Sequence, residues 1–124
     1  MNSFVFIGER PSNKALKMGV SWEDGRLAAK QLFDALRANG IEPEKQVYIN
    51  WFETSLGPFI PKTYIENSVM RLLLCGNTLV AMGKRVAKEL EVNGIPHLVI
   101  VHPAARGKIR KKNRYANHVG KVLK

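Results

Sequence analysis

Cysteine is almost missing from this sequence, since Cys75 is the only one among 124 residues. A single cysteine excludes a disulfide framework and a zinc or iron–sulfur centre held by several thiolates. We therefore expect Cys75 to pack as a small hydrophobic side chain. We expect neither a metal site nor a bound cofactor.

Long hydrophobic runs are missing as well. No stretch stays apolar over the roughly 20 residues that a bilayer crossing requires, and the chain opens directly on the strand-like run Phe4–Ile7 rather than on a signal peptide. These absences predict no membrane partner and a reducing, cytoplasmic setting. We expect a monomer.

Acidic residues are missing from the end of the chain. Residues 103–124 contain eight cations and no acid, within a total net charge of +10. The cations are Arg106, Lys108, Arg110, Lys111, Lys112, Arg114, Lys121 and Lys124. Such asymmetry favours nucleic acid as a partner, although a merely solvated basic tail has the same composition.

Short apolar runs alternate with amphipathic stretches along the rest of the chain. The runs predict strands over Phe4–Ile7, Gln46–Phe52, Thr78–Met82 and Leu98–Val101. Helices are expected from Asp24 to a cap at Gly40, from Thr63, over Lys84–Val92 before Asn93-Gly94, and around Tyr115, Val119 and Val122. Alternation of this kind predicts a parallel sheet with crossover helices. We expect a three-layer α/β/α sandwich with a short four-stranded parallel sheet, in one domain over residues 1–124.

The stretch from His97 to Lys112 combines the features that suggest a site. Leu98–Val101 resembles a strand buried on both faces, and Pro103 ends it because proline has no N–H for the ladder. His102 is thus delivered at the carboxyl end of a strand, which is where open α/β sheets bind ligands. Cations follow immediately, so we expect a phosphate-bearing partner.

Two loops at such strand ends could carry chemistry. One is Gly8-Glu9-Arg10-Pro11-Ser12, and the other is His102-Pro103-Ala104-Ala105-Arg106. Taken singly, the first could be a solvated turn and the second a structural histidine. Together, after the first and last strands, they predict a carboxylate and an imidazole that converge on one crevice.

These loops resemble two motifs of the uracil-DNA glycosylase superfamily. The resemblance is to one branch of this superfamily, in which the first motif is Gly-Glu-Ala-Pro-Gly and the second is His-Pro followed by Ala or Ser. The segments Gly25-Arg26-Leu27, Val47–Asn50 and Leu79–Lys84 match the intervening family segments in the same order. The chain is more compact than typical members and lacks the four cysteines that hold an iron–sulfur cluster in that branch.

The resemblance implies a four-stranded parallel sheet between helices and roles for four residues. Glu9 corresponds to the residue that orients or activates water, and His102 to the histidine that donates a hydrogen bond to the base carbonyl. Asn50 corresponds to the reader of the base edge, and Trp22 to the stacking aromatic residue. Under a strict register Trp51 takes the position of Asn50, because a one-residue slip turns a side chain to the other face of a sheet.

The resemblance also assigns the DNA contacts. Ile109 is the large apolar residue of the basic run, so we expect it to act as the wedge that enters the vacated base stack. The residues expected to contact DNA beside it are Ser12, Arg106, Lys108, Arg110, Lys111, Lys112 and Arg114.

The function expected from the sequence is a DNA glycosylase that removes uracil or a related damaged base by hydrolysis. One alternative is a catalytically silent nucleic-acid-binding module of the same fold. Another is an N-glycoside hydrolase acting on free nucleosides or nucleotides, against which the basic segment argues.

Overall fold

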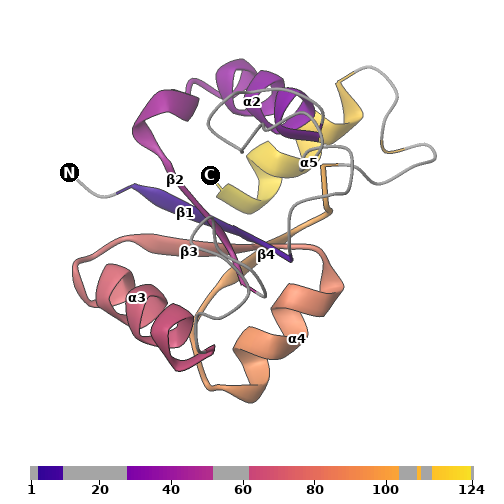
Figure 1. Cartoon of the computed structure of the whole chain (residues 1–124). Coiled ribbons are helices and arrows are strands. Elements are labelled where there is room, and N and C mark those ends of the chain that lie inside the picture. The colour runs from indigo at the N-terminus through magenta and orange to yellow at the C-terminus, as the bar shows by residue number, and fades with distance from the viewer. Residues whose placement is uncertain (1–2, 10–27, 52–61, 104–108, 110–112, 124) are drawn as a thin grey trace, which may run out of the picture.

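The computed structural model describes residues 3–9, 28–51, 62–103, 109 and 113–123. Within these ranges strands and helices alternate along the chain (Figure 1). In order they are β1 (Phe4–Gly8), α2 (Ala28–Ala38), the short 3₁₀ helix η2 (Pro43–Lys45), β2 (Val47–Asn50), α3 (Lys62–Leu74), β3 (Thr78–Met82), α4 (Lys84–Val92), β4 (Leu98–Ile100) and α5 (Arg114–Leu123).

The four strands form one parallel sheet in the order β2-β1-β3-β4. The central strand β1 aligns Val5 with Val47 on one side and with Leu79 on the other. Helices α2 and α5 cover one face of the sheet, and α3 and α4 cover the other (Figure 1). The predicted α/β/α sandwich with a four-stranded parallel sheet is therefore confirmed.

The core divides into two clusters because successive strand residues point to opposite faces. On β1, Phe6 packs into the cluster beneath α2 and α5. Its neighbours Val5 and Ile7 pack into the cluster beneath α3 and α4. All three side chains have no exposed surface, so β1 contributes buried side chains to both core clusters.

The end of α2 follows the sequence expectation. Gly40 has a φ of 75°, a left-handed conformation that costs glycine little. Its N–H donates to the Arg37 carbonyl, and the Ile41 N–H reaches back to the Leu36 carbonyl at 2.9 Å. This pair of bonds is the Schellman arrangement that satisfies the last carbonyls of a helix.

The end of the chain is a packed helix. Tyr115 and Val119 of α5 are buried in the cluster that α2 also covers. Residues 114–123 are therefore not a disordered tail, although the cations Arg114 and Lys121 of this helix are exposed. Met70, Leu74, Val92 and Val99 are the large apolar side chains left exposed in the described ranges.

Two expectations about burial are wrong. The Leu98–Val101 run is not buried on both faces, since Val99 is 42% exposed. Its strand lies at the edge of the sheet, where the outer helices cover the strand incompletely. Cys75 is exposed rather than packed, because it lies in the turn after α3.

Two element boundaries also differ from expectation. The second strand spans only Val47–Asn50, because η2 occupies the residues before it and the ladder ends with the bond from the Trp51 N–H to the Gly8 carbonyl at 2.7 Å. Helix α3 begins at Lys62, one residue before Thr63. The expected helix start at Asp24 lies outside the described residues.

None of the helices in the described ranges combines the length and the apolar character that crossing a membrane would need.

Candidate functional site

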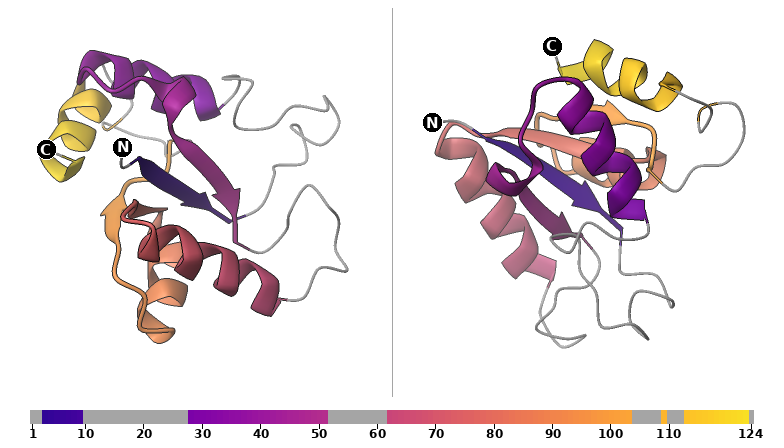
Figure 2. Two further views of the ribbon diagram at one scale, coloured as in Figure 1. Left: turned by 90° about the vertical axis from the view of Figure 1, so that its left-hand side faces the viewer. Right: turned by 90° about the horizontal axis from the view of Figure 1, so that it is seen from above.

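The residues of interest gather where the parallel strands end. The strands β1 and β2 run side by side with their arrowheads at the same end (Figure 2). Asn50 closes β2 opposite Gly8, and Glu9 follows Gly8 directly. Across the sheet, Gly83 follows β3, and His102 lies two residues beyond the end of β4. Topology alone therefore brings Asn50, Glu9 and His102 to one edge.

Glu9 is held by an arginine from the neighbouring helix. Arg85 lies in the first turn of α4, and its Nη1 donates to Glu9 Oε1 at 3.1 Å. The Glu9 side chain is 36% exposed and that of Arg85 is 62% exposed, so the pair adds little stability, about 0–1 kcal/mol. Its main effect is to orient the carboxylate.

Gly83 joins the ends of β3 and β4. Its N–H donates to the Ile100 carbonyl at 2.9 Å, and its φ of 98° is a conformation that L side chains rarely adopt. A Cβ at this position would lie 3.6 Å from His102 Cβ. That distance is an ordinary van der Waals separation, so the turn between β3 and α4 lies beside His102 and the positive φ is what favours glycine here.

His102 is half-buried, and burial sets its protonation. Burial lowers its pKa below the usual value, while the negative charge of Glu9 acts in the opposite direction and raises it. The net lowering favours a neutral ring at neutral pH. A neutral imidazole carries one N–H donor and one acceptor nitrogen, which suits it to donate to a carbonyl oxygen. The influence of Glu9 also means that the two predicted catalytic groups lie within electrostatic reach.

The structure decides between Asn50 and Trp51 as the residue at the site. Trp51 is 1% exposed and packs in the cluster beneath α3 and α4 with Ile65 and Val69. A base reader cannot lie in the core, so the Trp51 alternative is wrong. Asn50 is half-buried at the end of its strand and remains the candidate.

Most of the predicted DNA contacts fall outside the described residues. These are Ser12, Arg106, Lys108, Arg110, Lys111 and Lys112, together with the stacking candidate Trp22. Arg114 is described, and it lies exposed at the start of α5. The loops that would close a crevice between Glu9 and His102 are also outside these ranges, so the shared crevice stays a prediction.

The packing of Ile109 favours a structural role over the expected wedge. It is half-buried and packs against the core cluster beneath α2 and α5. A wedge must be free to enter the base stack, whereas Ile109 contributes to the packing of its own domain.

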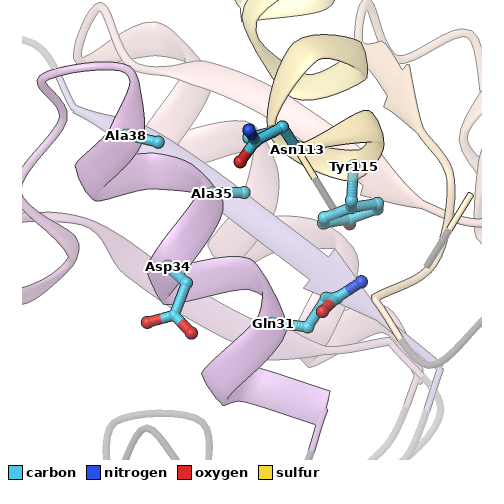
Figure 3. Close-up of a pocket in the computed structure, with 7 residues that line it drawn as sticks. Gln31, Asp34, Ala35, Ala38, Asn113 and Tyr115 are labelled. Carbon is cyan, nitrogen blue, oxygen red and sulfur yellow. The ribbon is translucent and has the colours of Figure 1, made fainter. Parts of the chain in front are cut away.

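A hollow of about 130 Å³ lies elsewhere, between α2 and α5 (Figure 3). Gln31 and Asp34 line it from α2, and Tyr115 of α5 and Asn113, the residue before α5, line it from the other side. None of its lining residues belongs to the predicted site. In the described part of the chain, no three histidine, cysteine or acidic side chains group as a metal would require.

Sequence reasoning missed three side chains that shape this edge. Arg85 pairs with Glu9, while Tyr115 and His118 of α5 both bond to the backbone of Val101, the residue before His102. The position of Arg85, three residues after the third predicted strand and at the start of the next predicted helix, could have indicated that it lies at this edge of the sheet. No sequence pattern indicates the contacts of Tyr115 and His118, because they depend on how α5 docks.

No model of a known protein family matches the chain, and no curated protein matches it.

Proposed function

We propose that the protein is a DNA N-glycosylase that removes uracil or a related damaged base by hydrolysis of the N-glycosidic bond. Glu9 and His102 are its proposed catalytic groups, and Asn50 is the proposed reader of the base edge. The uracil-DNA glycosylase-like motifs of the sequence support this choice of reaction.

The reaction separates charge, and the two groups match the two charges. As the bond between C1′ and the base nitrogen lengthens, positive charge gathers on the sugar and negative charge on the base carbonyl. Glu9 faces the sugar, where its carboxylate stabilises the cation and accepts a proton from the attacking water. The water oxygen bonds to C1′ as the bonding electrons leave with the base. The neutral His102 ring donates its N–H to the carbonyl oxygen that receives them.

One observation carries the proposal. Glu9 and His102 follow different strands of one packed sheet, and the charge of Glu9 nonetheless acts on the His102 ring. Side chains fixed at strand ends keep their geometry better than those on free loops. A carboxylate and a neutral imidazole held near each other at a ligand-binding edge form a pair suited to cleaving a bond that polarises.

DNA is the proposed substrate because cations border this edge. Lys84, Arg85 and Lys88 are exposed on the first turns of α4, and Arg114 opens α5. The helix dipole adds partial positive charge at the start of α4. Together with the cations of residues 103–112, these groups favour a polyanion over a single nucleotide.

The test is base release from defined oligonucleotides. The full chain is incubated with strands carrying uracil, hypoxanthine, xanthine or a mismatch, and abasic sites are counted as alkali-labile breaks. We expect breaks at one of these bases and no turnover of free deoxyuridine. Turnover of deoxyuridine with intact oligonucleotides would identify a nucleoside hydrolase instead.

The ion pair between Arg85 and Glu9 favours a second candidate, a silent module that binds nucleic acid without cleaving it. A carboxylate already paired with a guanidinium is less available to a sugar cation or to water. In that case the wild-type protein binds DNA through its cations and leaves every modified base intact.

A further inference from the structure

The outer edge of β4 presents backbone groups that the sheet cannot satisfy. The Ile100 carbonyl points inward, since it accepts the Gly83 N–H at 2.9 Å. Alternate residues of a strand direct their N–H and C=O to opposite sides, so those of Val101 point away from β3. Among the residues that the structure describes, no strand lies beyond β4 in the sheet. A partly buried backbone group in this position needs another partner.

Helix α5 provides both partners. The Tyr115 hydroxyl donates to the Val101 carbonyl at 2.7 Å, and the Val101 N–H donates to His118 Nε2 at 2.9 Å. The two side chains are three residues apart on one helix, so they lie on the same face. They occupy the place of a neighbouring strand at Val101 and cover the sheet edge at that point, while Val99 stays exposed.

Both side chains must be neutral for this arrangement. Burial raises the pKa of Tyr115 well above its ordinary value, so its proton stays available for donation. His118 accepts at Nε2, so its proton is on Nδ1. Burial lowers the pKa of His118, and the charge of Lys121 on the same helix lowers it further.

The surroundings of His118 add no opposing charge among the described residues. β4 presents to it the uncharged backbone of Val101, and the Tyr115 ring lies 6.2 Å away, between ring centroids. Helix α2 meets α5 on another side, where Asn39 contacts Ala116 and Gly120.

The clamped residue is the immediate neighbour of His102. Val101 is fixed on one side by two hydrogen bonds, and Pro103 on the other side is buried with a restricted φ. The backbone of His102 is therefore held at both ends, and its side chain lies beside Gly83, where a built Cβ would be 3.6 Å from His102 Cβ. We propose that Tyr115 and His118 are positioning residues, which fix the end of β4 so that His102 faces Glu9. The inference rests on the proposed function for its catalytic meaning but not for its geometry.

The test is the electrostatic coupling between Glu9 and His102, measured by NMR titration of the His102 ring in the full chain. Glu9→Gln should lower the His102 pKa, because it removes the charge that raises it. We expect this effect to shrink to less than about half in His118→Leu and in Tyr115→Phe, because a freed strand end lets His102 move away. His118→Gln should preserve the effect, since its side-chain oxygen replaces the Nε2 acceptor.

His97→Gln is the matched control, because the His97 ring bonds to the Ile95 carbonyl and His97 lies before β4, at the opposite end of the strand from His102. Coupling that stays unchanged in both Tyr115→Phe and His118→Leu would overturn the proposal. If His118→Leu does not fold, Tyr115→Phe, which retains the buried ring, decides alone.

The titration needs neither DNA nor turnover, so it stands apart from the proposed function. Where base release is detected, the single-turnover rate should fall roughly tenfold to a hundredfold in Tyr115→Phe, with unchanged DNA affinity. If every oligonucleotide stays intact, the proposed glycosylase activity is wrong, and the titration alone tests the positioning role of Tyr115 and His118.

Discussion

Gly120 on α5 lies so close to Asn39 at the end of α2 that a Cβ on Gly120 would overlap Asn39 Oδ1. Asn39 cannot easily move away, because its Nδ2 donates to the Ala35 carbonyl at 2.8 Å and to the Ala116 carbonyl at 2.9 Å. The contact fixes how α5 docks, and through α5 it fixes the side chains that hold Val101.

Gly120→Ala should therefore destabilise the protein even though alanine favours helices. The better helix propensity contributes about 1 kcal/mol, while two displaced hydrogen bonds cost about 1 kcal/mol each. We expect a net loss of about 1 kcal/mol in the free energy of unfolding, measured with urea. In an Asn39→Ala background the obstacle is gone, so the same substitution should become stabilising. A stabilising effect in both backgrounds would contradict the contact.

Acidification should weaken the fold before carboxylates titrate. Burial lowers the pKa values of both His102 and His118 in the folded state. As the pH is lowered through the ordinary histidine pKa of 6.5, the unfolded chain binds more protons than the folded one. The free energy of unfolding therefore decreases as the pH decreases. Urea unfolding at pH 7.5 and pH ~5.5 should show this fall. His118→Gln should flatten part of it, whereas stability that rises on acidification would contradict the assignment.

Ile109→Ala should reduce stability and leave DNA affinity unchanged, because Ile109 packs against the core. For a half-buried side chain we expect a loss of about 1–2 kcal/mol. Val99→Ala is the matched control on the exposed edge of β4, and it should cost less than about 0.5 kcal/mol. If Ile109→Ala instead loses the capture of a flipped base while its free energy of unfolding is unchanged, Ile109 acts as the wedge.

Lys111→Gln combined with Lys112→Gln should weaken DNA binding at every sequence. Each phosphate contact contributes about 0.9 to the slope of log K against log salt on duplex DNA, so the slope should flatten by nearly 2. Lys30→Gln with Lys45→Gln is the control, because those lysines pair with Asp34 and Glu42. Equal affinity of the wild type and the first double variant would exclude these lysines from the interface.

The layered fold could be predicted because its strands and helices carry clear local patterns. Phe4–Ile7 and Thr78–Met82 are apolar over the length of a strand, and Gly40 marks a helix end. The order of the strands has no local pattern. An apolar run such as Leu98–Val101 has the same composition in a central strand and at an edge, so the exposure of Val99 could not be predicted.

The candidate site could be predicted in part for the same reason. Glu9 and His102 follow strands, and parallel strands end at one edge of a sheet, so their common location follows from topology. The ion pair with Arg85 and the contacts of His118 depend on how helices pack against that edge. Such contacts join residues distant in the sequence, which composition and spacing do not encode.

The single-turnover rate of base release by Glu9→Gln tests the proposed catalytic role of Glu9 most directly. The substitution keeps the shape of the side chain and removes its charge, so DNA binding should be spared. Glu91→Gln, at an exposed carboxylate late in α4, is the matched control and should cleave as the wild type does. We predict that Glu9→Gln slows base release by roughly a hundred- to a thousandfold, because an interaction made in the transition state is lost. A wild-type protein that releases a base at a rate that Glu9→Gln leaves unchanged would contradict the account.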